Sequence, residues 1–339
     1  MSTLPGDFTC PALRDDLLAA RSFFGSQLFL YNLPMDLSII LLSYNTRDIT
    51  QQTLSSLGRA ITADKPLKIE VIVVDNASTD GSGEAIKKLQ TEPVASYQLQ
   101  AIYNKENVGF SKGNNIGLKQ STGKYVLFLN SDMIVDELRL SELITYMDAH
   151  PKVGVLTPRV ELSSGQIDPA SHRGFPTVWR SFCYYSSIEK LATLLAAPRQ
   201  RRAQRSSQLS SFFGGYHLSG EDVTKEHEID ACTGAFLLIR GDLVRKVGGF
   251  DEQFFMYGED LDLCYQVKTL GYQVVWYPHQ KVTHLKYSSG LGSSTPETRK
   301  QIRWHFYDAM EKFYLKHYSH THFALINRMI ISLIHIKKS

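Results

Sequence analysis

Two adjacent carboxylates, Glu259 and Asp260, are the residues of this 339-residue chain best placed to do chemistry. They follow Gly258 and begin a predicted helix over residues 259–270, which Gly271 would end. One face of that helix would be apolar and packed, with Leu263, Cys264, Val267 and Leu270 on it. A carboxylate held at the start of a packed helix can act as a general base. The alternative is that one of the pair only caps the helix, because acidic side chains favour helix N-termini.

Asp75 is the first of two polar features that end predicted strands. It follows an aliphatic run over residues 69–74 and precedes a segment rich in Asn, Ser and Gly over residues 76–82. A carboxylate at the end of a strand can accept a hydrogen bond from a nucleobase or a ribose, and such a loop offers free backbone donors. An ordinary strand-to-helix turn with a capping side chain explains the same residues, so both interpretations stay open.

The second feature is Asn130-Ser131-Asp132, which ends an apolar strand predicted over residues 125–129. Asp132 could bind a divalent cation that bridges two phosphates, since a hard cation on a diphosphate keeps few protein ligands. Asn130 could meet a ribose hydroxyl. A structural turn stabilised by these side chains is the alternative.

Two common phosphate-binding motifs are excluded by their spacing. Gly117 and Gly123-Lys124 are separated by five residues rather than the four of a P-loop, and they precede a strand. Gly81-Ser82-Gly83 lacks the third glycine of a dinucleotide-binding loop.

The elements that must position these groups alternate along the first half of the chain. Strands are predicted over residues 37–42, 69–74, 97–103, 125–129 and 153–156, and helices over residues 48–59, 81–90, 107–119 and 140–149. This alternation predicts an α/β fold, with a Rossmann-like, mostly parallel central sheet flanked by helices. The polar groups would then meet at the carboxyl ends of the strands, where open α/β sheets bind ligands.

The second half of the chain is less regular. We expect an N-terminal extension over residues 1–35, a main domain over residues 36–290 and a C-terminal helical extension over residues 291–339. The periodic pattern weakens over residues 161–228, which we interpret as an insertion with a helix near residues 188–197. It returns over residues 229–239, and a final strand is predicted over residues 273–277, followed by helices over residues 301–318 and 323–336.

Composition excludes several other classes of protein. A net charge of +3 is too small to indicate a nucleic-acid partner. The four cysteines, at positions 10, 183, 232 and 264, show no paired spacing, which argues against a disulfide framework or a zinc site and fits a reducing compartment. The apolar run over residues 17–33 is interrupted by Arg21 and Gln27, so neither a signal peptide nor a membrane span is predicted there.

Taken in order, these segments resemble the inverting glycosyltransferases of family 2, which have the GT-A nucleotide-sugar-binding fold. The resemblance is strongest to the rhamnosyltransferase-like branch that builds bacterial surface polysaccharides. The matching segments span residues 36–290 and comprise residues 37–45, 71–82, 107–115, 125–132, 233–236 and 248–270.

The resemblance implies a role for each candidate residue. The nucleotide sugar would be bound by Ser43, Tyr44, Asn45, Asp75, Asn76, Asn107, Gly109, Asn130 and Ser131. Asp132 and His284 would hold a divalent cation, Mg²⁺ or Mn²⁺, and Asp260 would be the catalytic base with Glu259 beside it. The chain departs from the family at the usual Asp-x-Asp motif, which is Asn130-Ser131-Asp132 here and leaves a strict metal requirement in question. A plain core or surface histidine is the alternative for His284.

The same resemblance implies a dTDP- or UDP-linked sugar donor, carrying rhamnose or another hexose, and a glycan or lipid-linked glycan acceptor. It implies a cytoplasmic enzyme bound peripherally at the inner face of the cell membrane. The helix over residues 323–336 is too short to span a bilayer, which takes ~20 apolar residues. With Arg328, Ser332 and His335 on one stripe, and Phe323, Ile326, Ile330 and Leu333 opposite, it could dock on a membrane, on the main domain or on a second subunit of a homodimer.

Two other functions are weighed against this one. A sugar nucleotidyltransferase would need a glycine-rich, basic triphosphate loop early in the chain, and residues 37–47 offer only Arg47. A non-catalytic nucleotide-sugar-binding subunit would not need both Asp132 and Asp260, which are intact.

Overall fold

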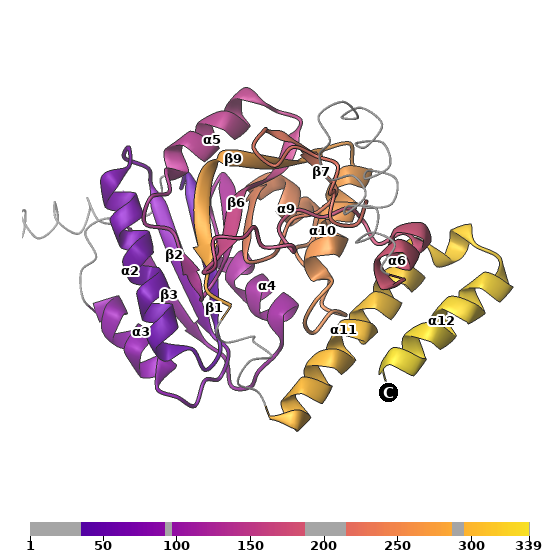
Figure 1. Ribbon diagram of the computed structural model, residues 1–339. Helices are drawn as coiled ribbons and strands as arrows, with labels where there is room; N and C mark the ends of the chain where they lie inside the picture. The colour runs from indigo at the N-terminus through magenta and orange to yellow at the C-terminus, as the bar shows by residue number, and fades with distance from the viewer. Residues whose placement is uncertain (1–34, 92–96, 187–214, 287–294, 339) are drawn as a thin grey trace, which may run out of the picture.

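The computed structural model describes residues 35–91, 97–186, 215–286 and 295–338 (Figure 1). Its strands are β1 (Leu37–Ser43), β2 (Ile69–Asp75), β3 (Gln98–Tyr103), β4 (Tyr125–Asn130), β5 (Met133–Ile134), β6 (Val153–Leu162), β7 (His227–Ile229), β8 (Phe236–Arg240) and β9 (Gln273–His284). Its helices are α2 (Arg47–Ala63), α3 (Ser82–Thr91), α4 (Phe110–Gln120), α5 (Leu140–Ala149), α6 (Val178–Tyr185), α9 (Gly241–Val247), α10 (Glu259–Thr269), α11 (Pro296–His317) and α12 (Ala324–Lys338), with a short 3₁₀ turn at Ser319–Thr321.

The strands form one sheet in the order β3-β2-β1-β4-β8-β6-β9-β5, with β7 paired to β9. Strands β1 to β4 pair in parallel, as do β6 and β9, whereas β8, β5 and β7 run against their neighbours. The α/β fold with a mostly parallel central sheet is therefore confirmed. Strands β1 and β2 are nearly continuous aliphatic runs because helices cover both of their faces.

Each face of the sheet has its own apolar core (Figure 1). On one face, α2, α3 and α5 contribute Leu57, Ile86 and Leu143 to a core with β1 and β2. On the other face, α4, α9, α10 and α11 pack around Phe128, Phe250 and Trp276. Helix α10, which begins with Glu259 and Asp260, is thus packed against the sheet.

The register of the parallel strands brings the predicted polar groups together. Ser43 is paired with Asp75, Asp75 with Tyr103, and Leu42 beside Ser43 with Asn130. The carboxyl ends of β1, β2, β3 and β4 therefore form one edge, as predicted from the alternation of elements.

Several predicted elements need correction. The strands predicted over residues 153–156 and 273–277 are much longer, because β6 continues past Pro158 through a shift of register with β9 that breaks the sequence pattern. Leu270 does not join the apolar face of α10: it is the C-terminal cap and is exposed. The helix expected near residues 188–197 lies outside the described residues, whereas α6, in the same irregular region, was not predicted.

Candidate active site

The nucleotide end of the site centres on Asp75. One carboxylate oxygen, Oδ2, accepts a hydrogen bond from the Ser78 amide at 3.3 Å, whereas Oδ1 is buried with no hydrogen-bond partner among the described residues. The side chains of Tyr44 and Tyr103 are about half exposed at the same edge. A side chain at Gly83 would lie 3.3 Å from Asp75 Oδ2 and 3.8 Å from the Tyr103 ring, so glycine leaves these groups open. A lone buried acceptor beside aromatic rings suits a flat, hydrogen-bonding group such as a nucleobase.

The side chains of Asn45, Asn76 and Asn107, which were predicted to bind the nucleotide, form hydrogen bonds with other residues of the protein. Asn45 Oδ1 accepts from the Thr79 amide at 2.7 Å. The Asn76 amide group donates to Asn107 Oδ1 at 2.8 Å and accepts from the Val108 amide at 3.1 Å. These bonds tie together the loops that follow β1, β2 and β3. In this structure the three side chains therefore stabilise these loops.

Gly109 is required by its backbone, which has a φ of +86°. An added Cβ would come within 2.6 Å of the Phe255 carbonyl oxygen, and the next residue, Phe110, donates its amide to that same oxygen at 2.7 Å. Gly109 therefore allows the loop after β3 to contact the loop that leads into α10.

The hydroxyls of Ser43 and Ser131 also face protein. Ser43 is fully buried, and its Oγ lies 3.0 Å from Thr50 Oγ1. Ser131 Oγ lies 3.3 Å from Thr46 Oγ1, and its carbonyl accepts from Thr53. These residues fix the start of α2 beneath the edge of the sheet.

Asp132 and His284 come together as the sequence prediction requires. Met133, the residue after Asp132, is paired with His284 across the β5–β9 ladder. His284 Nε2 lies 3.3 Å from Asp132 Oδ1 but is not aligned as a hydrogen bond, and it has no other partner among the described residues. A neutral imidazole nitrogen and a carboxylate oxygen are both donors that a divalent cation accepts.

The other ring nitrogen of His284 is fixed by Asp168, whose Oδ2 lies 2.7 Å from Nδ1. Burial alone would lower the pKa of His284, but the Asp132 and Asp168 carboxylates outweigh it and raise the pKa to about 9. The carboxylates of Asp132 and Asp168 therefore favour a positive charge at His284. That charge is either a proton on the imidazole ring or a cation that displaces the proton. No group of three or more His, Cys, Asp or Glu side chains in the described ranges has metal-site geometry. A cation between Asp132 and His284 would take its other ligands from a diphosphate or from water.

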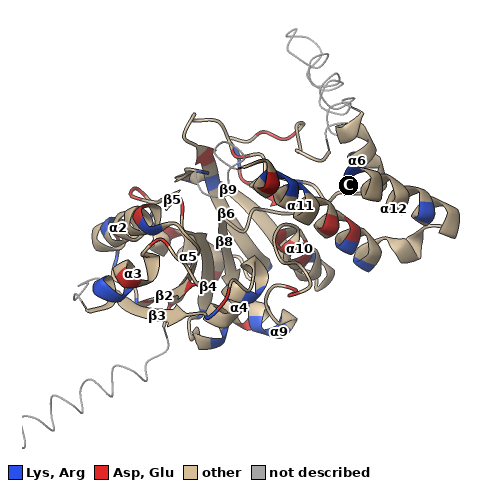
Figure 2. Ribbon diagram, turned by 90° about the horizontal axis from the view of Figure 1, so that it is seen from below, with Lys and Arg blue, Asp and Glu red and all other residues tan. Residues whose placement is uncertain are grey.

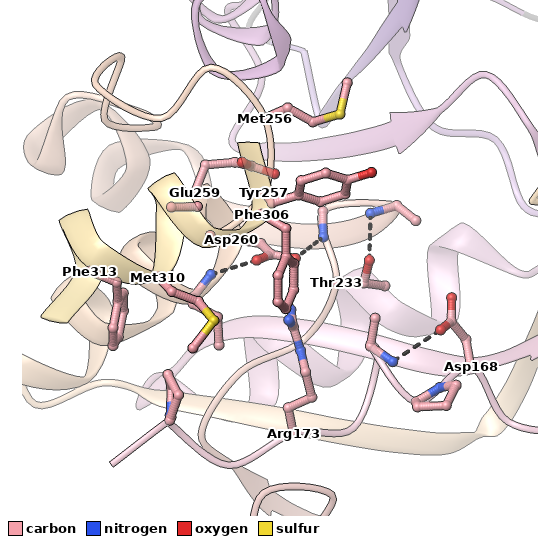
Figure 3. Close-up of a pocket in the computed structure, with 18 of the residues that line it drawn as sticks. Asp168, Arg173, Thr233, Met256, Tyr257, Glu259, Asp260, Phe306, Met310 and Phe313 are labelled. Carbon is pink, nitrogen blue, oxygen red and sulfur yellow. Dashed lines mark hydrogen bonds and ion pairs between the residues drawn. The ribbon is translucent and has the colours of Figure 1, made fainter. Parts of the chain in front are cut away.

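The predicted base, Asp260, lies in the first turn of α10 and is held on three sides. Its Oδ2 accepts from Arg173 Nη2 at 2.7 Å and from the Gly234 amide at 3.0 Å, and its Oδ1 accepts from the Leu261 amide at 2.7 Å. Figure 3 shows Arg173 reaching toward Asp260 across the pocket. The helix is capped by Gly258, which is left-handed with a φ of +79°, so neither carboxylate is the N-cap.

Glu259 differs from its neighbour in forming no ion pair among the described residues, although the charge of Arg173 acts on both carboxyl groups. It is buried, and its Oε2 has no hydrogen-bond partner in the part of the chain that the structure describes. Burial, and then the nearby charge of Asp260, raise the pKa of Glu259 to about 8. A buried carboxyl group with a strongly raised pKa, next to a second carboxyl group in a cavity, is typical of a catalytic site.

This shift predicts a pH-dependent cost in stability. The folded state binds the Glu259 proton more tightly than the unfolded state, so the free energy of unfolding falls as pH rises from about 4.5 to about 8. Glu259→Gln cannot ionise and is expected to become more stable than the native protein over this range, by on the order of 2–4 kcal/mol at pH 8. Urea unfolding at pH 5 and pH 8 measures the difference. A gap that stays constant between these pH values would contradict the assignment.

One cavity of about 450 Å³ extends from His284 to Asp260. Its polar lining includes Asn130, Asp168, Arg173, Glu259, Asp260 and His284. Its other walls are mainly aromatic and apolar, from α6 and α11, and Figure 3 shows Phe306, Met310 and Phe313 on one side. Of the residues assigned to the nucleotide sugar, Asn130 lines this cavity and the others do not, and neither does Asp132.

Sequence reasoning missed Asp168 and Arg173. Both lie in the region interpreted as an insertion, residues 161–228, whose two ends in fact belong to β6 and β7. The sequence signal was the presence of two charged residues, Asp168 and Arg173, in a short segment that otherwise consists mostly of small and polar residues.

Two family models match the chain. Residues 38–241 match glycosyl transferase family 2, and residues 222–332 match glycosyl transferase family group 2. The chain belongs to glycosyltransferase family 2.

Similar proteins are known from several bacteria. The chain is 24% identical over 263 residues to N-acetylglucosaminyl-diphospho-decaprenol L-rhamnosyltransferase of Mycobacterium tuberculosis, covering 74% of this chain and 76% of that protein. It is 25% identical over 208 residues to the rhamnosyltransferase WbbL of Escherichia coli, covering 58% and 67%. Poly-beta-1,6-N-acetyl-D-glucosamine synthase of Staphylococcus epidermidis is 22% identical, with 79% and 53% covered.

Solved structures support the fold. A mannosyltransferase from Pyrobaculum calidifontis, solved with GDP-Man and Mn²⁺, aligns with a TM-score of 0.52 and 16% identity, covering 88% of this chain and 74% of that one. GalNAc-T7, solved with UDP, GalNAc and Mn²⁺, aligns with a TM-score of 0.53 and 13% identity, covering 84% and 50%. The chain is therefore a rhamnosyltransferase-like glycosyltransferase with a GT-A fold.

Proposed function

We propose that this glycosyltransferase moves a hexose, rhamnose or a related sugar, from a dTDP- or UDP-linked donor to a hydroxyl of a lipid-linked glycan, with inversion at the anomeric carbon. The observation that carries the proposal is a set of three buried polar atoms without hydrogen-bond partners among the described residues. They are Asp75 Oδ1, His284 Nε2 and Glu259 Oε2. Buried polar atoms are almost always paired, so these three call for a ligand that reaches all of them.

The nucleoside would bind at the carboxyl ends of β1 and β2. Uracil and thymine each present an N3–H donor, which Asp75 Oδ1 can accept, and their rings can stack against Tyr44 or Tyr103. This geometry suits the pyrimidine bases of the dTDP- and UDP-linked donors that the family resemblance implies.

The diphosphate would lie near Asp132 and His284, on Mg²⁺ or Mn²⁺. A cation bound there would neutralise the charge that builds on the leaving diphosphate. The donor set fits such an ion because Asp132 Oδ1 and His284 Nε2 converge and the ring is already fixed by Asp168. The relatives solved with Mn²⁺ support this choice of cation.

The transfer itself is a single displacement. The acceptor hydroxyl oxygen forms a bond to the anomeric carbon, the bond from that carbon to the diphosphate oxygen breaks, and the hydroxyl proton passes to Asp260. Arg173 and the Gly234 amide hold Asp260 in place for that proton. Glu259, kept neutral by burial, avoids a second negative charge beside the base and could donate a hydrogen bond to the acceptor.

The acceptor would enter along the aromatic walls of the cavity. On the α11 side this wall consists of Phe306, Ala309, Met310 and Phe313, none of which can hydrogen-bond to a sugar hydroxyl, whereas the α6 side adds Ser181, Tyr184 and Tyr185. Tyr185 donates its hydroxyl to Met310 Sδ at 3.2 Å, within the wall. An apolar isoprenoid tail suits this lining better than a free glycan, and the Mycobacterium tuberculosis relative is named for a decaprenol-linked acceptor.

The test is a thermal-shift screen of the full chain against nucleoside diphosphate sugars, with and without Mn²⁺ or Mg²⁺. A ligand that binds only the folded state raises its melting temperature. We expect a shift with one pyrimidine donor that grows with the cation. A purine donor as the best ligand would contradict the proposed dTDP- or UDP-linked donor, and binding without turnover would favour the non-catalytic subunit.

We also propose that the C-terminal segment places the enzyme at the inner face of the cell membrane. No helix in the described ranges is long and apolar enough to span a bilayer. The orientation of α12 differs from the sequence prediction: Ile334 is buried toward the protein, whereas the exposed stripe comprises Leu325, Met329, Leu333 and Ile336, with Phe323 before it. Arg328 and Lys337 flank the stripe and α12 has no acidic residue, a composition typical of a helix lying on an anionic bilayer (Figure 2).

Leu325→Glu with Leu333→Glu is expected to lower binding to vesicles of phosphatidylglycerol and phosphatidylcholine at least tenfold, because both side chains would enter the interface. Vesicle co-sedimentation measures the loss. A matched control is Lys87→Gln with Lys105→Gln, an equal change in net charge at exposed sites far from α12 in sequence. Equal vesicle binding by both variants would contradict docking through α12, and a monomer formed only by the α12 variant would indicate a homodimer interface instead.

A further inference from the structure

Residues 168–173 form a single short segment that reaches both ends of the reaction cavity. Asp168 bonds to His284 at the cation end, and Arg173 bonds to Asp260 at the base end. Both side chains, with Pro169 and Ala170 between them, line the cavity (Figure 3). We refer to residues 168–173 as the strap.

The strap is anchored on both sides, so the positions of its two charged side chains are fixed. The Asp168 amide donates to the Val160 carbonyl of β6 at 2.9 Å. Arg173 exchanges two backbone hydrogen bonds with Ala231, at 3.1 and 3.0 Å. Between them, Ser171 is fully buried and His172 is nearly so, with its Nε2 2.7 Å from His227 Nε2.

Neither charged side chain is explained by folding alone. Asp168 is fully buried and accepts from Lys286 Nζ at 2.8 Å as well as contacting His284. Arg173 donates from the same nitrogen, Nη2, to Asp260 and to the Cys232 carbonyl at 3.0 Å, while its Nε has no hydrogen-bond partner among the described residues. Buried ion pairs seldom add net stability, so a positional role is the simpler explanation.

We propose that the strap is the positioning element of the site, in which Asp168 fixes the ring of His284 for the cation and Arg173 fixes the carboxylate of Asp260 for proton transfer. This inference rests on the proposed function. A histidine that binds a metal through Nε2 needs its proton on Nδ1, and a carboxylate that accepts that proton also sets the angle of the ring. Likewise, a base acts only if its free lone pair meets the acceptor hydroxyl, which the bonds from Arg173 and Gly234 ensure.

The cation arm is tested by titrating Mn²⁺ and measuring its free fraction by electron paramagnetic resonance. Asp168→Asn is expected to weaken Mn²⁺ binding 10- to 100-fold. In a His284→Gln background, adding Asp168→Asn should change the Mn²⁺ affinity by less than threefold, because Asp168 acts through the ring of His284. Lys286→Gln, which removes the other partner of Asp168, is the control and should leave Mn²⁺ affinity within threefold.

The outcomes separate this inference from the proposed function. Native protein that binds Mn²⁺ while Asp168→Asn binds it equally well would overturn the role of Asp168 and leave the cation in place. Native protein that fails to bind Mn²⁺ would overturn both. If Asp168→Asn does not fold, ¹⁵N NMR of the native protein with Mg²⁺ decides: a proton on Nδ1 of His284 with none on Nε2 supports the role, and any other state of the ring overturns it.

The base arm is tested by kinetics. Arg173→Met is expected to lower kcat at least 30-fold and Arg173→Lys less, with donor affinity within threefold of native in both. Arg180→Met is the matched control, because Arg180 forms a similar ion pair with Asp230 on the same side of the protein without touching the base. It should lower the melting temperature but leave kcat per folded molecule within threefold. Equal losses of kcat in Arg173→Met and Arg180→Met would overturn the role of Arg173.

Discussion

Asp260→Asn is expected to lower kcat for transfer by about 10³-fold or more while leaving donor affinity nearly intact. General-base catalysis contributes about 10²–10⁴-fold to a rate, and the amide cannot take a proton from the acceptor hydroxyl. Because Asp260 contacts the acceptor side of the cavity rather than the nucleotide end, donor binding does not depend on its charge. Single-turnover kinetics with a saturating donor, and donor affinity by calorimetry, measure the two effects.

The control for this variant is Asp242→Asn. Asp242 is the second residue of α9, as Asp260 is the second residue of α10, but it is exposed. Its replacement should leave both constants unchanged within about twofold. An active Asp260→Asn protein would move the base to Glu259, whose free Oε2 and raised pKa of about 8 also suit proton transfer at neutral pH.

Asp132→Ala is expected to abolish the increase in donor affinity that Mn²⁺ or Mg²⁺ produces and to lower kcat/KM at least 100-fold. The loss follows because His284 Nε2 would remain as the only protein ligand seen at the cation position in the described residues. Donor binding without added cation should change little, since the proposed contact to the base is at Asp75, at the end of β2. Calorimetric titrations of the donor, with Mn²⁺ and with a chelator, separate the two contributions.

Asp136→Ala provides the comparison for Asp132. Asp136 lies four residues along the chain, where it forms an exposed ion pair with Arg59. Exposed pairs of this kind contribute about 1 kcal/mol or less, so neither stability nor donor affinity should change appreciably. A donor affinity in native protein that is independent of any cation would contradict the role given to Asp132, and would make Asn130-Ser131-Asp132 a structural turn.

The elements with strong local patterns could be predicted from the sequence. The helix over residues 140–149 matches α5 in full, and the aliphatic runs before Asp75 and Asn130 became β2 and β4. Because parallel strands present their carboxyl ends on one edge, the meeting of Ser43, Asp75 and Asn130 followed from the alternation of elements alone.

The contacts that complete the site could not be predicted in this way. Arg173 and Asp260 are 87 residues apart, and Asp168 and His284 are 116 apart. The strap is held by an isolated bridge rather than by a helix or a long strand. Such a segment has no periodic pattern of apolar residues that would reveal its position in the fold. The exposure of the apolar stripe on α12 was also hidden, because the helix carries apolar residues on more than one face and only packing on α11 decides which is covered.

The most direct test of the central claim is the anomeric configuration of the product. Native protein would be incubated with the donor found by thermal shift, Mg²⁺ and a diphospho-lipid-linked N-acetylglucosamine acceptor, and the new linkage read by one-bond C–H coupling in NMR. A single displacement with Asp260 as base predicts a linkage of configuration opposite to that of the donor, and no such product from Asp260→Asn. A product that retains the donor configuration would contradict both the mechanism and the role of Asp260.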